Sequence, residues 1–72
     1  MRYYFNVHDG RDFIDRAGVE CQNLDAARTE AIRAAGEMLR DKSADLWTGE
    51  TWTMHVKDEY GITVCELTFC AK

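Results

Sequence analysis

Apolar side chains at every second position open the chain and predict a β-strand over residues 2–8. Successive side chains of a strand point to opposite faces of its sheet. One face of this strand is apolar and should pack on the core: Tyr3, Phe5 and Val7. The other face is mixed: Tyr4, Asn6 and His8. The Asp9-Gly10 pair that follows is a turn signal and should end the strand.

The segment after this turn carries weaker signals. Phe13 and Ile14 are candidates to resume strand pairing, and residues 15–18 have the composition of a loop. A short strand is predicted over residues 18–21.

Apolar positions at helical spacing predict an amphipathic helix from about Leu24 to Lys42. Asn23 is suited to cap its first turn, and Asp25 suits the positive end of the helix dipole. Arg28 falls inside the apolar stripe, where its stem should pack while its guanidinium turns toward Asp25. The stripe predicted to face the core is Leu24, Ala27, Ala31, Ala34, Ala35, Met38 and Leu39, with Ile32 at its edge.

The last third of the chain has the pattern of a β-hairpin. Residues 58–61, Asp-Glu-Tyr-Gly, are typical of a type I turn. A four-residue loop would pair Lys57 with Ile62 and Met54 with Cys65. This register gathers the apolar side chains on one face: Trp52, Met54, Val56, Cys65, Leu67 and Phe69.

These elements predict an α+β fold in which one helix packs on one face of a four-stranded antiparallel sheet, in the order ββαββ. The 72 residues are too few for a second core, so we expect residues 1–72 to form a single domain. Trp52 should lie in the core. Trp47, after the helix, is expected to fold back over the open end of the core.

Charge and cysteine content narrow the function classes. The net charge of −4 is spread along the chain without a basic stripe, which disfavours binding to nucleic acid. Cys21, Cys65 and Cys70 form no C-x-x-C pair, and reduced thiols fit a cytoplasmic location. There is no signal-peptide pattern and no apolar run long enough for a bilayer, so we expect no membrane association.

Four motifs carry a resemblance to a known family. They are R-Y-Y-F-x-V-x-D-G at the start, D-x-x-G-x-E from Asp15 to Glu20, L-D-A-A-R-x-E-A from Leu24 to Ala31, and V-x-D-E-x-G from Val56 to Gly61. The chain resembles a family of small bacterial proteins, common in alphaproteobacteria, known only as a domain of unknown function. The resemblance covers nearly the whole chain and implies no activity.

The face of the sheet opposite the helix is the best candidate for a binding surface. An uncovered face with aromatic, imidazole, amide and carboxylate groups suits a protein partner or a second copy, and the alternative is an ordinary solvated face. The residues we place in this site are Tyr4, Asn6, His8, Thr53, His55, Val64 and Glu66.

Catalysis and metal binding have little support in the pattern. His8 and His55 share a predicted face, but two histidines on separate strands lack the local spacing of a metal box. Ser43, the only serine, has no histidine near it in sequence. We therefore predict no catalytic residue, no metal and no cofactor.

The sequence favours a non-catalytic interaction module that forms a homodimer or docks a protein partner through the open sheet face or a sheet edge. The alternative is a small acidic protein that binds nucleic acid or a nucleotide, or that mimics nucleic acid.

Overall fold

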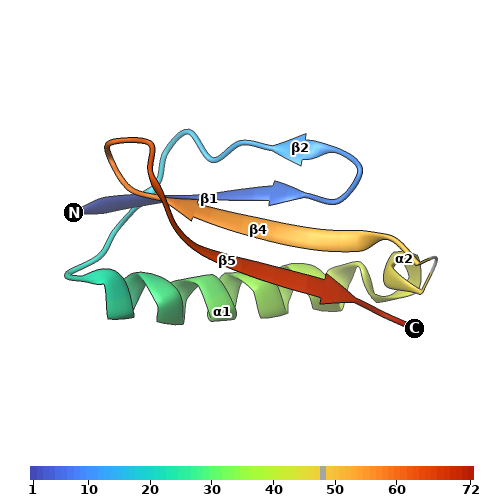
Figure 1. The fold of residues 1–72 in the computed structure, drawn as a ribbon. Coiled ribbons are helices and arrows are strands. Elements are labelled where there is room, and N and C mark those ends of the chain that lie inside the picture. The colour runs from blue at the N-terminus through green and yellow to red at the C-terminus, as the bar shows by residue number, and fades with distance from the viewer. Residues whose placement is uncertain (48) are drawn as a thin grey trace.

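The computed structural model describes residues 1–47 and 49–72; Thr48, in the polar connection after the helix, lies outside the described residues. A long helix lies along one face of an antiparallel sheet (Figure 1). The predicted α+β class is thereby confirmed. The elements are β1 (Arg2–His8), β2 (Asp12–Phe13), β3 (Val19–Glu20), α1 (Leu24–Asp41), α2 (Ser43–Leu46), β4 (Thr51–Lys57) and β5 (Thr63–Cys70).

The sheet has the order β2-β1-β4-β5, and β3 also pairs with β1. The predicted order ββαββ was wrong in detail, because two strands of two residues each replace the single second strand and α2 follows the main helix. Both short strands lie on the same edge of β1. β2 pairs with Val7 and His8, and β3 pairs with Arg2 and Tyr3.

Helix α1 begins as its sequence predicts and buries the alanines of its predicted stripe, but Met38 of that stripe is 38% exposed and Ile32 at its edge is 61% exposed. The side chain of Asn23 accepts a hydrogen bond from the N–H of Ala26 at 2.8 Å, which confirms the cap. The small side chains of the buried stripe let the helix lie close to the sheet: Ala27, Ala31 and Ala35. Arg28 Nη1 lies 3.6 Å from Asp25 Oδ1, in the pairing that the spacing predicts.

The core lies between α1 and the two central strands. Its largest fully buried side chains come from β4: Trp52, Met54 and Val56. At the end of the core that follows α1, the buried side chain is Leu46 of α2. Trp47 is 69% exposed and does not cover this end. The prediction for Trp47 was wrong because the single turn of α2 directs Leu46 inward and leaves the next side chain in solvent.

The predicted hairpin register was also wrong. Met54 lies opposite Leu67 and Val56 opposite Cys65, a shift of two positions from the predicted pairing of Met54 with Cys65. Val64 is an extra, bulged residue, because Lys57 lies opposite Thr63. A register shift of two residues leaves every side chain on the face predicted for it, so Cys65 and Leu67 still pack against the core.

Candidate functional site

The sheet face opposite α1 brings the two histidines together. His8 lies near the end of β1 and His55 in the middle of β4, where His55 is opposite Asn6. They are therefore diagonal neighbours on adjacent strands. Their ring centroids are 5.0 Å apart, with the ring planes tilted by 52°.

Each histidine also contacts a carboxylate on its outer side. His8 Nδ1 lies 2.6 Å from Asp12 Oδ1, and His55 Nε2 lies 2.9 Å from Glu66 Oε2. Asp12, His8, His55 and Glu66 thus form a row across β2, β1, β4 and β5, which we call the histidine row. Asp12 was not predicted as a site residue, because only the pairing of β2 with β1 places it beside His8.

The other predicted site residues lie in different environments. Asn6 is only 7% exposed, since the chain after β2 crosses it and its Oδ1 accepts the N–H of Asp15 at 2.9 Å. Tyr4 and Thr53 are half-buried, and Thr53 lies opposite His8. Val64 is the bulged residue of β5 and packs against the core cluster.

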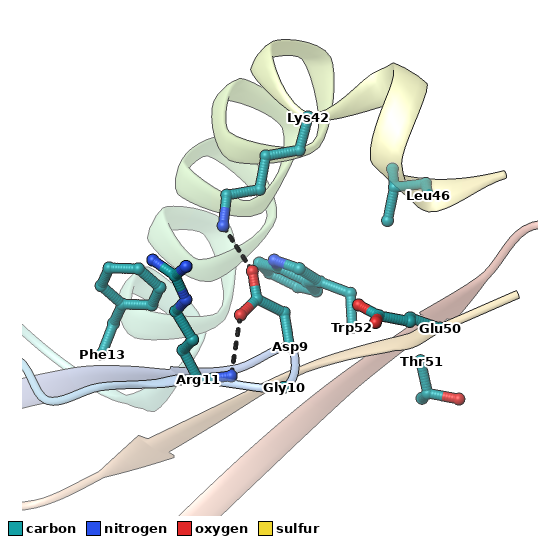
Figure 2. Close-up of a pocket in the computed structure, with 9 residues that line it drawn as sticks. All are labelled: Asp9, Gly10, Arg11, Phe13, Lys42, Leu46, Glu50, Thr51 and Trp52. Carbon is teal, nitrogen blue, oxygen red and sulfur yellow. Dashed lines mark hydrogen bonds and ion pairs between the residues drawn. The ribbon is translucent and has the colours of Figure 1, made fainter. Parts of the chain in front are cut away.

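A second feature is a pocket of about 480 Å³ at the carboxyl end of α1 (Figure 2). Lys42 forms an ion pair with Asp9 across its mouth, and the same ammonium lies 4.9 Å from the centroid of the Phe13 ring. The hydrogen bond from Lys42 lowers the pKa of Asp9. The pocket is lined by Asp9, Gly10, Arg11, Phe13, Lys42, Leu46, Glu50, Thr51 and Trp52.

The pocket walls have balanced charge and one unsatisfied donor. Two cations, Arg11 and Lys42, and two carboxylates, Asp9 and Glu50, line the pocket. The indole Nε1 of Trp52 is buried and has no hydrogen-bond acceptor among the described residues.

The ion pair between Asp9 and Lys42 connects the turn after β1 to the end of α1, so the contact has a clear structural role. No local pattern predicts this contact, because the two residues are 33 positions apart.

The three cysteines differ in exposure. All three are free thiols; Cys21 is buried, Cys65 is half-buried and Cys70 is exposed. Burial raises the pKa of the Cys65 thiol, although the nearby charge of Arg28 opposes the shift. A raised pKa keeps this thiol protonated and works against nucleophilic chemistry.

The two edges of the sheet differ. On the outer side of β1, β2 and β3 occupy the ends, and between them Asp15 Oδ2 accepts the N–H of Phe5 at 3.2 Å. At the opposite edge, β5 is eight residues long and pairs only with β4 within the described part of the chain.

Other kinds of site find less support in residues 1–47 and 49–72. No group of three or more His, Cys, Asp or Glu side chains there is arranged to hold a metal ion. Neither helix in this part of the chain combines the length and apolar content that a bilayer span requires.

Comparisons with curated proteins and with solved structures gave no match. One family model does match, and it covers residues 2–70 of the chain. The match spans all the strands and helices described above. The chain therefore belongs to the family described as Domain of unknown function (DUF6894).

Proposed function

We propose that this protein is a small, non-catalytic interaction module that self-associates through the edge of β5. The observation that carries the proposal is the contrast between the two sheet edges. The β1 edge is occupied by β2, Asp15 and β3, whereas the eight residues of β5 have a paired strand on one side only in the described chain. An unpaired strand edge accepts another strand through main-chain hydrogen bonds.

The apolar side chains beside this edge support the proposal. On β4 the core-facing side chains are fully buried, but Phe69 of β5 is 42% exposed. Ile32 is 61% exposed on α1, the helix that packs against β5. Ile32 of α1 and Phe69 of β5 thus leave apolar surface beside the unpaired edge of β5. A partner bound at this edge would bury that surface.

A second copy of the chain is the occupant that fits best. Two copies of β5 have the same length, and a two-fold axis would align them antiparallel with the same apolar residues on both sides. A chain of 72 residues also buries little surface alone and gains stability from association.

The open sheet face is the weaker of the two surfaces. Asn6 is already covered, and His8 and His55 are engaged with carboxylates. Nucleic-acid binding through this face has less support still, because Asp12 and Glu66 place negative charge on it. A titration with single-stranded oligonucleotides at low salt would test that alternative, and saturable binding would favour it.

The test is light scattering coupled to size-exclusion chromatography, in reductant and over a wide concentration range. We expect a mass of two chains at high concentration. Ile32→Glu should shift the protein to monomer, whereas Ile14→Glu, the same change at an exposed isoleucine beside the β1 edge, should leave the dimer intact. A wild-type monomer at all concentrations would contradict self-association and direct the search to a foreign strand. Equal loss of dimer in both variants would contradict the assignment to β5.

A further inference from the structure

The histidine row has the chemistry of a metal site, and nothing in the family description assigns it that role. We propose that His8 and His55 together bind one divalent transition-metal ion of the Zn²⁺, Ni²⁺ or Cu²⁺ class. Imidazole nitrogen is a preferred ligand for all three ions. This proposal rests on the sheet face and is independent of association through β5.

The spacing of the rings fits two ligands on one ion. A tetrahedral ion with metal–nitrogen bonds of about 2.0–2.1 Å holds the centres of two imidazole rings about 5 Å apart. The ring centroids of His8 and His55 are 5.0 Å apart. The strands that carry them, β1 and β4, are direct neighbours at the centre of the sheet.

The carboxylates have the arrangement found around metal-bound histidines. Such a histidine directs one ring nitrogen to the ion and the other to a carboxylate, carbonyl or water, which fixes the ring and raises its basicity. Here Asp12 contacts Nδ1 of His8 and Glu66 contacts Nε2 of His55. The nitrogens left for the ion are therefore Nε2 of His8 and Nδ1 of His55.

The backbone beneath the pair lies over the core. Val7 precedes His8, Met54 precedes His55, and both side chains are buried against α1 on the other face of the sheet. The two histidines are thus carried by strand segments anchored in the core, which limits the ordering that ion binding requires.

The site would be open rather than closed. Within the described residues no third histidine, cysteine or carboxylate joins the pair in a metal-holding group, so the protein supplies two ligands and water completes the coordination. An open site of this kind exchanges its ion and is loaded only when the free ion is abundant.

The experiment is a calorimetric titration of the metal-free full chain with ZnCl₂. The chain carries Cys70→Ser, so that the exposed thiol cannot bind the ion. We expect one ion per chain, and loss of saturable binding in both His8→Gln and His55→Gln. Asp12→Asn and Glu66→Gln should each weaken binding about 10- to 100-fold. Glu37→Gln, which removes an exposed carboxylate on α1, is the matched control and should bind as the parent does.

A second measurement does not depend on the variants folding. Zinc should move the NMR signals of His8 Nε2 and His55 Nδ1 in the parent protein, and the other nitrogen of each ring should keep the shift of a hydrogen-bonded N–H. Absence of saturable binding, a stoichiometry of one ion for two chains, or binding that survives both histidine substitutions would overturn the proposal.

Discussion

Asp15 accepts a hydrogen bond from the main-chain N–H of Phe5 at 3.2 Å. Its carboxylate thus takes the place of the carbonyl that a neighbouring strand would offer to the middle of β1. Its other oxygen accepts the N–H groups of Ala17 and Gly18, and its own N–H donates to Asn6. One side chain therefore shapes the loop between β2 and β3 and covers the edge of β1. Within residues 1–47 and 49–72, the one long strand edge left unpaired is therefore that of β5.

The first prediction follows from these contacts. Asp15→Ala should lower the free energy of unfolding by about 2 kcal/mol, because it leaves the half-buried N–H of Phe5 without an acceptor. Urea denaturation followed by circular dichroism measures the change. Asp41→Ala, at an exposed carboxylate near the end of α1, should stay within about 0.5 kcal/mol of the parent. A similar loss in both variants would show that Asp15 has no special role.

The same substitution at two glycines should have opposite effects. Gly18 has a φ of +72°, and a Cβ atom there would lie 3.0 Å from the carbonyl oxygen of Tyr3 and 2.9 Å from the Tyr4 ring. Gly18→Ala should therefore destabilise the fold by about 2 kcal/mol or more. Gly36 lies in α1 with nothing within 4 Å of the added atom, so Gly36→Ala should stabilise it by about 0.5–1 kcal/mol. Thermal melts of the two variants check the signs. A stabilised Gly18→Ala would contradict the strained conformation at this position.

Local patterns predicted the helix well and the sheet less well. The cap at Asn23 and the alanine stripe depend on residues within one or two turns of each other, which a sequence displays directly. The register of β4 and β5 depends on the loop. Asp58 accepts the N–H groups of Tyr60 and Ile62, which lengthens the turn, and the bulge at Val64 then adds a second shift.

The candidate site was predictable in composition but not in geometry. The alternation along each strand placed His8 and His55 on one face. Their proximity required the pairing of β1 with β4. The contact with Asp12 required β2, which lies at Asp12–Phe13, one residue before the weak strand signal at Phe13 and Ile14. The pocket at Asp9 and Lys42 was missed for the same reason, since only the packed fold joins the turn to the helix end.

The third prediction concerns thiol reactivity. Cys70 is exposed, whereas burial raises the pKa of Cys65 and Cys21 is buried. Because the thiolate is the reactive species, the folded protein should show one fast-reacting thiol and two that are slower by on the order of tenfold or more. A disulfide reagent with a coloured leaving group gives the rates. Cys70→Ser should remove the fast phase, and urea should make the remaining thiols react together; a fast phase that persists in Cys70→Ser would contradict this order.

The last prediction is the pH dependence of the contact between Asp9 and Lys42. Lys42 holds the pKa of Asp9 below its ordinary value, so the unfolded chain binds a proton at Asp9 more readily than the folded one does. The stabilisation is then fully present above the ordinary aspartate pKa of about 3.9 and is lost as the pH falls through the lower pKa of the folded state.

Asp9→Asn removes this titration and serves as the test. At neutral pH the variant should be less stable than the parent by about 1 kcal/mol, a modest loss because the Lys42 side chain is partly exposed and screened by solvent. Denaturation curves of both proteins between pH 7 and about pH 2.5 should show this difference shrinking toward zero at the acid end. Glu20 and Glu30, whose pKa values are also lowered by their partners, titrate in both proteins and cancel in the comparison. A difference that stayed constant over the whole range would mean that the side chain of Asp9 contributes through packing and not through its charge.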